Sequence, residues 1–510
     1  MNRRRFFQSS LAAAVAASIP ARKSMAALFS ATTEVSADVN AMTGDGAEVV
    51  LKQSAVQDLS DSLRGRLLLR GDEGYDKARR ILEPSFDKYP GLIVQCAGSA
   101  DVRSAVNFAR AENLLVAVKC GGHSASGKST CDGGMMIDLS PLRNIRVDPI
   151  ARTADVSGGS LLGHMDHDTM EYGLVTTAGT VSHTGIGGLT LGAGFGRVGR
   201  RFGLALDNVL EVDIITADGE FRRANKDENP DLYWAVRGGG GNFGVVTSFK
   251  FQLHPMQRQV IRGHFVFSES DAKNALNFFA EYADNAPDDL YVNGGLLVNS
   301  SQDNRFSNSG AVADNISVSI QICYSGPHDQ ADALLAPIRK AGKLIVDDVR
   351  ALDYVLVQKM GDNLDPRNAR YLKAGFVGVI TPQLVDDMLG GLEPHPGRSH
   401  SVSFQHAGGA IGRVAEDATA FAHRASKHDL LCGVSWPTGT EGAEHIAYIR
   451  RYWTGIESHT RGFYINSLND KTQVMVNSNY RGNYDRLVKI KNKYDPGNLF
   501  RLNANVQPTV

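Results

Sequence analysis

The chain has 510 residues, of which 42% are hydrophobic and 21% charged, and a formal net charge of −1. This length accommodates two or three domains with their own cores, and the composition is that of an ordinary globular protein. A net charge near zero, without a basic stripe interleaved with aromatic residues, argues against nucleic-acid binding. It also gives no general attraction to an anionic membrane.

The first segment predicts export. Residues 2–8, Asn-Arg-Arg-Arg-Phe-Phe-Gln, resemble the twin-arginine pattern, and the apolar stretch at 11–19 is too short to span a bilayer. We therefore expect residues 1–40 to be a twin-arginine signal peptide and linker, with the twin-arginine export machinery as a partner. The mature protein would be periplasmic or secreted, without a stable membrane anchor. A disordered basic tail is the alternative interpretation.

The five cysteines predict neither a disulfide framework nor a zinc site. Their number is odd and none lies in a CxxC pair. Buried free thiols are the default, and a Cys120–Cys131 disulfide is an option in an oxidising compartment. We expect no metal site.

Strand and helix patterns begin after residue 90. A buried strand at 92–96, a helix capped by Asp101 and a second buried strand at 115–118 predict a βαβ-like unit. The following patterns predict a helix at 161–172 and strands at 210–216, 220–223 and 245–253. The stretch 180–196 between them is too rich in glycine for an ordinary helix or strand.

The sequence pattern changes between about residues 258 and 461, where glycine clusters become rare. Helices at 270–282 and 329–341 alternate with strand-like runs at 316–323, 371–376 and 401–405. In the first of these runs, Ile316, Val318, Ile320 and Ile322 alternate and are predicted to share one face. This pattern predicts a separate α+β unit. The last segment holds a helix at 484–493 and a polar tail.

Three glycine loops, at 121–127, 185–196 and 238–244, predict an anion-binding site. Backbone N–H groups without side chains beside them can form nests for a pyrophosphate. No loop has the GxGxxG spacing followed by an acidic residue after a second strand, so a Rossmann nicotinamide site is not predicted. The loops together favour a different dinucleotide.

His123 lies inside the first loop, between glycines and small residues that offer it little to pack against. A neutral imidazole has one free nitrogen, which can attack an electrophilic centre. This position therefore favours attachment of a cofactor to the imidazole.

With these loops, the chain resembles the FAD-binding domain of the vanillyl-alcohol oxidase and p-cresol methylhydroxylase superfamily (the PCMH type). Within that superfamily it is similar to the berberine bridge enzyme-like group. The motifs that carry the resemblance are Lys119-Cys-Gly-Gly-His-Ser-Ala-Ser-Gly127, Gly179-Thr-Val-Ser-His-Thr-Gly-Ile-Gly-Gly188, Leu191-Gly-Ala-Gly-Phe-Gly196, Asn229-Pro-Asp-Leu-Tyr-Trp-Ala-Val-Arg-Gly-Gly-Gly-Gly-Asn-Phe-Gly-Val-Val246, Tyr464-Ile-Asn466, Asn483-Tyr-Asp-Arg-Leu-Val488 and Tyr494-Asp-Pro-Gly-Asn-Leu-Phe-Arg501. They occur in order over most of residues 80–510.

The resemblance implies an α+β fold in two parts. The FAD-binding domain of the PCMH type would comprise residues 41–257, with its core at 86–257, and a C-terminal berberine bridge-like segment at 462–510. An inserted α+β substrate domain at 258–461, built on an antiparallel sheet, would cover the flavin ring.

The resemblance also implies how FAD is held. The family's flavin-linked histidine matches His123, and Val181 stands where some members carry a second, cysteine linkage, so we expect a single covalent bond. Thr184 lies near the position that controls oxygen access in the family. The other residues expected at the cofactor are Lys119, Cys120, Gly121, Gly122, Ser124, Gly127, Thr180, Ser182, His183, Gly185, Gly187, Gly188, Gly192, Gly244, Val246, Asn466, Asn503 and Asn505. Lys119 and Cys120 depart from the arginine and serine that are frequent in the family.

The catalytic base is expected on the substrate side. Tyr464 is the first candidate, because the Tyr-x-Asn segment returns the chain to the flavin, and Lys373 is a candidate for the cation that a tyrosinate needs. Gln405 and His406 precede a glycine pair and are expected to face the ring. For all four residues a satisfied interior polar group is the alternative. Tyr480 is a second candidate base.

The function implied is that of an FAD-dependent oxidase. It would transfer a hydride from a small organic substrate (an alcohol, sugar, phenol or N-heterocycle) to the covalent flavin, and molecular oxygen would reoxidise the flavin and form hydrogen peroxide. Two alternatives remain at this stage, a flavin dehydrogenase with a non-oxygen acceptor and a secreted, non-catalytic ligand-binding protein. The intact Gly122-His123 pair and the three loops argue against the second alternative.

Overall fold

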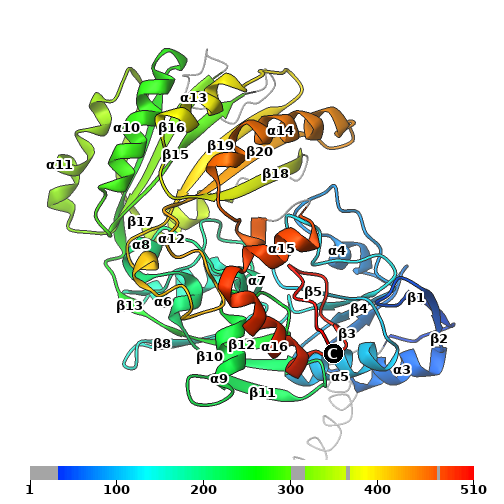
Figure 1. Cartoon of the computed structure of the whole chain (residues 1–510). Helices are drawn as coiled ribbons and strands as arrows, with labels where there is room; N and C mark the ends of the chain where they lie inside the picture. The colour runs from blue at the N-terminus through cyan, green and yellow to red at the C-terminus, as the bar shows by residue number, and fades with distance from the viewer. Residues whose placement is uncertain (1–32, 300–315, 363–367, 468–470) are drawn as a thin grey trace, which may run out of the picture.

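A computed structural model describes residues 33–299, 316–362, 368–467 and 471–510 (Figure 1). The predicted signal peptide falls largely on residues 1–32, outside the described residues. Among the helices in the described ranges, none combines the length and the apolar character that crossing a bilayer requires.

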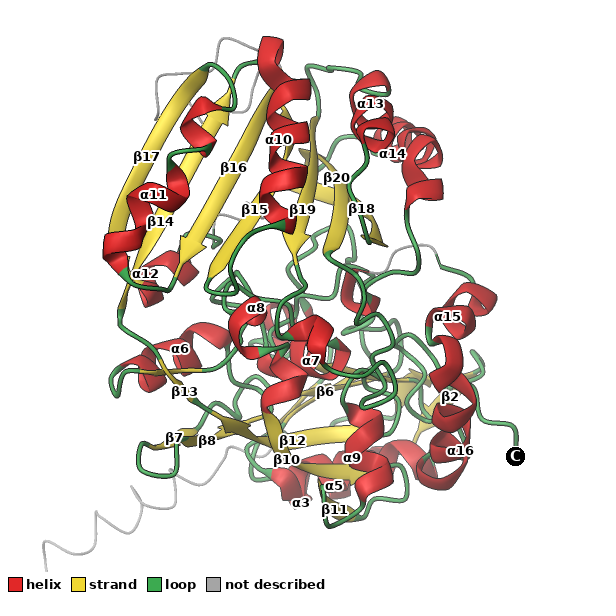
Figure 2. Cartoon of the chain, turned by 60° about the vertical axis from the view of Figure 1, so that its left-hand side comes forward, coloured by secondary structure: helices red, strands yellow, loops and turns green. Residues whose placement is uncertain are grey.

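The molecule has two parts (Figure 2). A large sheet, covered by helices on one face, lies above a second part that holds a four-stranded sheet, a five-stranded sheet, shorter strand pairs and several loops. The chain builds most of the second part first, then the large sheet, and finally returns to the second part. The mixed α+β fold that the sequence predicts is confirmed.

The first small sheet has four strands in the order β3-β4-β6-β5. Its strands are β3 (Arg66–Leu68), β4 (Leu92–Gln95), β5 (Val116–Lys119) and β6 (Met135–Asp138). The pairs β4–β6 and β5–β6 are parallel, as expected for a βαβ-type unit. The helix α5 (Ser99–Ala111) connects β4 to β5 and buries Val102, Val106 and Ala109 in the same core. Asp101 was predicted as its cap, but Gly98 holds that position and the Asp101 carboxylate instead accepts the backbone N–H of Ala97 at 2.7 Å.

The second small sheet is antiparallel, with strand order β11-β10-β12-β8-β7. Its strands are β7 (Ile145–Asp148), β8 (Thr153–Ser157), β10 (Val209–Thr216), β11 (Phe221–Asn225) and β12 (Gly244–Gln252). Phe249 and Phe251 of β12 lie in one core with Leu487 and Ile490 of the C-terminal helix α16 (Tyr484–Tyr494). The C-terminal segment is therefore part of this half of the molecule.

The large sheet has seven antiparallel strands in the order β17-β14-β16-β15-β19-β20-β18. The strands are β14 (Gln259–Phe267), β15 (Leu290–Val298), β16 (Ile316–Tyr324), β17 (Leu344–Asp353), β18 (Asn368–Val377), β19 (Ser399–His406) and β20 (His428–Pro437). The helices α10 (Ala272–Asp284), α11 (Ala331–Leu335), α13 (Pro382–Gly390) and α14 (Ala443–Ile456) contribute to the core on its covered face. Val318, Ile320 and Ile322 are buried in that core, with Ile316 packed against it, which confirms the predicted alternation.

The other face of this sheet, here called the inner face, carries the alternate residues. One row across it is Gln405, Asp429 and Phe376, each paired with the next on neighbouring strands. Phe376 packs with Phe195 of the glycine-rich stretch, with ring centroids 5.9 Å apart. The inner face is therefore turned toward the glycine loops.

The last residues of the chain are fixed by a buried lysine. Lys491 of α16 donates to the Asp495 carboxylate at 2.6 Å and to the carbonyls of Asn242 at 2.8 Å and Phe500 at 3.1 Å. Its side chain is 0% exposed. These bonds hold the residues after 495 against the loop that contains Asn242, which lies in the third glycine-rich region.

The glycine-rich stretch 180–196 differs from the prediction, because it contains a short helix, α7 (Ile186–Gly192). Ile186, Gly187, Thr190 and Gly192 of this helix are buried, so packing against the rest of the protein stabilises it. The predicted helix 329–341 is also shorter, as α11 followed by a 3₁₀ turn. The remaining helices and strands are β1 (Val39–Met42), β2 (Glu48–Leu51), β9 (Leu174–Val175), β13 (His254–Pro255), α3 (Gln53–Ser62), α4 (Tyr75–Arg79), α6 (Leu162–Met170), α8 (Gly199–Phe202), α9 (Pro230–Val236), α12 (Tyr354–Lys359) and α15 (Gln473–Asn479).

Candidate active site

A cavity of about 360 Å³ lies where the three glycine loops meet the C-terminal segment. Twelve of the residues predicted at the cofactor line it: Cys120, Gly121, Gly122, His123, Ser124, Gly185, Gly187, Gly188, Gly244, Val246, Asn466 and Asn503. Thr184 and Tyr464 line it as well. Residues that are more than 300 positions apart in the sequence thus form one wall.

Glycine is required where two of the loops touch. A Cβ on Gly121 would lie 2.3 Å from the backbone nitrogen of Gly185, and a Cβ on Gly185 would lie equally close to the nitrogen of Gly121. Gly122 has a φ of +71°, a conformation that other residues rarely adopt. The first two loops can therefore pack backbone against backbone only with these residues.

Seven predicted residues lie outside the lining. Four of them have contacts that support the loops: Lys119 donates to the carbonyl of Ala78, Thr180 accepts from Arg197, Ser182 donates to the Asp362 carboxylate, and Asn505 accepts from Gln473. The other three are Gly127, His183 and Gly192. Of these three, His183 contacts His123 of the lining directly.

His123 is partly buried and lies at the cavity wall beside a second imidazole. Its Nε2 is 2.6 Å from Nδ1 of His183, and its Nδ1 is 3.3 Å from the Thr184 hydroxyl. Burial, followed by the neighbouring His183, lowers the pKa of His123 to about 4. The ring is consequently neutral near pH 7 and keeps a lone pair for bond formation.

The neighbouring Cys120 is a partly buried free thiol. Burial raises its pKa to about 11, so it is not a thiolate at neutral pH. All five cysteines lie in the described ranges and are free, including Cys120 and Cys131. The optional disulfide between these two is absent from this structure.

The hydroxyl of Tyr464 lies among hydrogen-bond donors at the edge of the cavity. Its oxygen accepts hydrogen bonds from the backbone N–H of Gly194 at 3.1 Å and from the Asn466 amide at 2.9 Å. Asn466 also donates to the carbonyl of Gly188 at 2.9 Å, which ties the phenol to α7. Burial nevertheless raises the pKa of Tyr464 well above its ordinary value, so the phenol is protonated at rest.

Two predicted catalytic residues lie on the wrong face of the sheet. Lys373 pairs with Cys432, which is buried in the core of the covered face, and its ammonium group lies over the Tyr371 ring, 5.6 Å from the centroid. His406 lies on that face too, where it stacks on His428 and accepts a hydrogen bond from Arg200. Both predictions were wrong because strand side chains alternate between faces, so one position decides the outcome.

Gln405, by contrast, lies on the inner face, where it forms a hydrogen bond with the buried Tyr291. Beside it on β20 is Asp429, which the sequence analysis missed. Asp429 is 0% exposed, and no donor of the described chain reaches either carboxylate oxygen. A carboxylate inside an otherwise apolar strand, His-Asp-Leu-Leu-Cys, is the signal that could have revealed it.

Tyr480, the second candidate base, is buried away from the inner face. Its hydroxyl donates to the carbonyl of Ala504 at 3.2 Å. This contact holds the C-terminal tail, and it explains the presence of a tyrosine at this position without a catalytic role.

The cavity wall fits FAD in its chemistry. Ser129 and Asn503 each expose to it a buried side-chain oxygen that has no partner in the described chain. Apolar side chains such as Val118, Leu139 and Val246 line the same wall. Open glycine backbone suits a pyrophosphate, and the apolar walls suit the flat rings of adenine and flavin.

A second cavity, of about 340 Å³, begins at the same histidine. His123 and Ser124 line one side of it, and Arg370, Leu372 and Ser401 of the inner face line the other. It lies between the two parts of the molecule and can admit a small molecule next to the first cavity.

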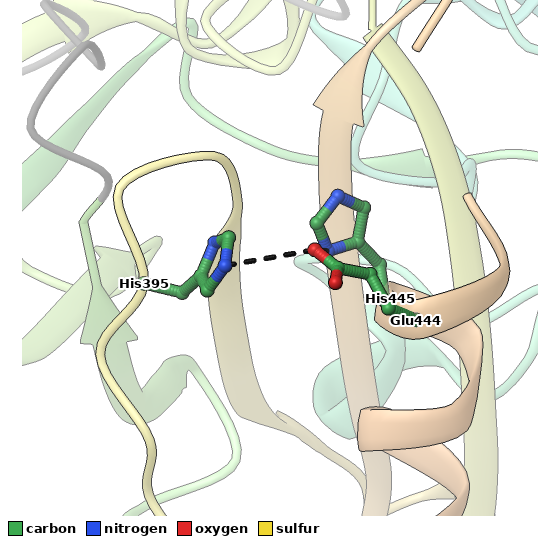
Figure 3. A group of neighbouring side chains, drawn as sticks. All are labelled: His395, Glu444 and His445. Atoms are coloured by element: carbon green, nitrogen blue, oxygen red, sulfur yellow. Dashed lines mark ion pairs between the residues drawn. The ribbon is translucent and has the colours of Figure 1, made fainter. Parts of the chain in front are cut away.

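A group of metal-ligand residues lies elsewhere, at the outer end of the large sheet (Figure 3). Nε2 of His395 and Nδ1 of His445 each lie 3.6 Å from the carboxylate of Glu444. Nδ1 of His395 accepts a hydrogen bond from the backbone N–H of Gly397 at 3.0 Å. The neutral ring then carries its proton on Nε2, which leaves no lone pair for an ion facing the group.

Comparison with known proteins agrees with this site. A family model described as FAD binding domain matches residues 90–225, and one described as berberine and berberine like matches residues 463–507. A FAD-linked oxidoreductase of Dictyostelium discoideum is 31% identical over 459 residues, which is 89% of this chain and 97% of that protein. (R)-6-hydroxynicotine oxidase of Paenarthrobacter nicotinovorans is 27% identical, covering 88% of this chain and 97% of that enzyme.

Solved structures show the same fold. 6-Hydroxy-D-nicotine oxidase from Arthrobacter nicotinovorans has a TM-score of 0.77 at 26% identity and covers 88% of this chain and 98% of its own. Xylooligosaccharide oxidase from Myceliophthora thermophila has a TM-score of 0.78 at 22% identity, with 89% and 99% covered.

The fold, the glycine-lined cavity and these relatives define an FAD-binding oxidoreductase. The chain belongs to the family of berberine bridge enzyme-like FAD-linked oxidoreductases.

Proposed function

We propose that this enzyme carries FAD through a single covalent bond to His123 and oxidises a small organic molecule by hydride transfer, with molecular oxygen as the electron acceptor and hydrogen peroxide as the second product. The observation that carries the proposal is His123, a neutral, partly buried imidazole at the junction of the two cavities. One cavity suits the cofactor and the other admits a substrate.

The linkage follows from the contacts of the imidazole. Nε2 of His123 is engaged with His183 at 2.6 Å, whereas Nδ1 has only the long 3.3 Å contact with Thr184. Nδ1 is therefore the nitrogen that would hold the flavin, and His183 would fix the ring and its tautomer. Cys120 is a protonated thiol and Val181 is aliphatic, which supports a single bond.

FAD, when bound, supplies the hydride acceptor. The protein's own part is to bind and orient the substrate, exclude water and take up the proton that an O–H or N–H group loses. Tyr464 is the group at the cavity edge that can exchange a proton there, and Asn466 holds its oxygen. Gln405 on the inner face would orient the substrate.

The substrate class follows from the relatives and from the second cavity. The relatives include oxidases named for a hydroxylated nicotine and for xylooligosaccharides. The second cavity offers serine hydroxyls and Arg370 beside Leu297 and Leu372. An alcohol, sugar, phenol or N-heterocycle with both polar and apolar surface fits this lining.

A substrate panel tests the proposal. The purified protein is mixed without oxygen with 6-hydroxynicotine, xylo-oligosaccharides and phenolic alcohols, and flavin absorbance is followed near 450 nm. At least one compound should bleach the flavin, and air should restore the colour with one peroxide per turnover. Bleaching followed by slow recovery in air would identify a dehydrogenase, and flavin that no compound bleaches would favour a ligand-binding protein.

We also propose export through the twin-arginine route, supported by residues 2–8 of the sequence. The test is fractionation of a bacterial host that has this route, comparing the wild type with R3K/R4K. The wild type should be outside the cytoplasm and the variant inside it. Equal distribution of both would contradict export by this route.

A further inference from the structure

One buried side chain on the inner face has no role in the proposed function. Asp429 of β20 lies between Gln405 of β19 and Phe376 of β18 on the same face of the sheet. It is 0% exposed, and of the carboxyl groups in the described ranges it alone is buried with both oxygens lacking a donor. Asp166, which is also fully buried, accepts a hydrogen bond from Gln358.

Such a residue destabilises the fold. A polar group buried without a hydrogen bond loses its hydration and gains nothing in return, and an ionised carboxylate loses much more. Proteins keep such groups chiefly where function needs them. The position of Asp429 is therefore informative.

The aromatic cluster below the sheet connects Asp429 to the active site. Phe376, its neighbour on β18, packs against Phe195 at 5.9 Å, and Phe195 packs edge-on against Tyr464 at 5.2 Å. Burial is the main cause of the raised pKa of Tyr464, and the charge of Asp429 adds to it. Tyr464 lines the cavity, whereas Asp429 does not.

Tyr464 has its own proton to give. Its oxygen already accepts hydrogen bonds from Gly194 and Asn466, so the hydroxyl hydrogen is available to a further acceptor. A phenol that takes a proton from the substrate must pass one on, because two protons on its oxygen would make it a strong acid. Asp429 is the acceptor that the inner face provides.

We propose that Asp429 is the positioning residue that receives the proton of the oxidised substrate, through the hydroxyl of Tyr464. This inference rests on the proposed function. The substrate's C–H leaves as a hydride with both bonding electrons, and its O–H or N–H proton passes to the Tyr464 oxygen. The former Tyr464 proton passes to Asp429, and a C=O or C=N bond forms. Because no donor reaches Asp429 in this structure, the step requires the two residues to come into hydrogen-bond contact when the substrate is bound.

The surroundings of Asp429 give the step a pH dependence. The facing groups on β19 and β18 are uncharged, namely Gln405 and Phe376, and the facing titratable group is Tyr464. His406 and His428 lie on the covered face. Burial raises the pKa of Asp429 to about 7, so the carboxylate that can accept a proton is present above pH 7 and is lost below it.

The test uses the holoenzyme and Asp429→Asn, with Asp166→Asn as the matched control. Asp166 is equally buried, and burial raises its pKa to about 7 as well, but it lies on α6. The rate of flavin reduction is measured by anaerobic stopped flow from pH 5.5 to 9. We expect the wild-type and D166N rates to rise through pH 7, and D429N to be about 100-fold slower and independent of pH. D429N with the wild-type rate and profile would overturn the proposal.

A double-mutant cycle and a thermal melt add readouts that a purely structural role would not give. If both residues form one relay, Y464F/D429N should be no slower than Y464F alone; losses that multiply would contradict the relay.

The melting temperature of D429N should exceed that of the wild type at pH 8 and match it at pH 5, because the amide removes a buried charge. Should D429N carry no flavin, a wild-type reduction rate that does not change with pH would overturn the proposal. A wild type that no substrate reduces would refute the proposed function instead, while the melts would still report the titration of Asp429.

Discussion

The two halves of this enzyme hold their functional groups in different ways. In the FAD-binding half the cavity wall is built from short, continuous loops, in which Gly121, Gly122 and His123 are neighbours in the sequence. In the large sheet the inner face is built from single residues on separate strands, such as Gln405 and Asp429, which pairing brings together. Chemistry supplied by backbone is visible in a local motif, whereas chemistry supplied by strand register is visible only once the strands are paired.

The halves also differ in electrostatics. The covered face of the sheet buries His400, His406 and His428, and burial lowers the pKa of each of them. The FAD-binding half lowers the pKa of His123 in the same way but places it at a cavity. The same physical effect therefore serves packing in one half and proposed bond formation in the other.

A substitution at the contact between the first two glycine loops should have the largest effect. Gly121→Ala puts a Cβ 2.3 Å from the backbone of Gly185, which cannot move away as a flexible side chain could. We expect protein without flavin, measured as the ratio of absorbance at 450 nm to that at 280 nm. Gly455→Ala, in the helix α14 where a Cβ meets open space, should keep its full flavin content. Full flavin in G121A would show that the loops are less tightly packed than described.

The proposed proton-transfer residue at the cavity edge gives the next effect. Tyr464→Phe removes the hydroxyl that is proposed to exchange protons and leaves the ring packed against Phe195. General acid–base groups contribute about 100-fold to 10,000-fold to the rate, so flavin reduction should slow by at least about 100-fold with flavin content unchanged. Reduction by stopped flow measures this, and a loss below about threefold would remove Tyr464 from the proton transfer.

The covered face should make the protein sensitive to acid. Burial lowers the pKa of His428 to about 3, against about 6.5 in an unfolded chain. Between these values the unfolded state binds the extra proton, so stability falls as pH falls from 6.5 toward 3. His428→Leu should reduce the loss of unfolding free energy between pH 6.5 and 4.5 by about 2–3 kcal/mol, as measured by urea denaturation. His167→Leu at the surface should leave the loss unchanged.

The smallest effect separates the two faces directly. Lys373→Met changes a residue on the covered face, and Gln405→Leu changes its counterpart on the inner face. We expect K373M to change the rate of flavin reduction by less than about twofold, since Lys373 faces away from the glycine loops. Q405L should raise the KM for substrate several-fold. The reverse order would show that the register of β18 or β19 is misassigned.

Much of the FAD-binding half could be predicted from the sequence, because the glycine motifs are contiguous and their backbone geometry is local. The α+β fold and the face shared by Val318, Ile320 and Ile322 were predicted from periodicity, and the structure confirms both. The predictions for Lys373 and His406 were wrong because each side chain lies on the opposite face of the sheet from the one expected. No local sequence pattern determines which face a strand residue takes. The helix α7 was missed because glycine has a low helix propensity, and tertiary packing overrides that propensity here. Asp429 belongs to no motif, and only its burial and pairing reveal it.

The covalent bond between FAD and His123 is the central claim, and the mass of one peptide tests it most directly. The protein is denatured in acid, digested and separated, and the yellow peptide is sequenced by tandem mass spectrometry. We predict that the flavin colour stays with the polypeptide and that the peptide containing His123 carries the mass of one FAD, which His123→Ala abolishes. Flavin released entirely into the acid supernatant, or attached to a different residue, would contradict the account.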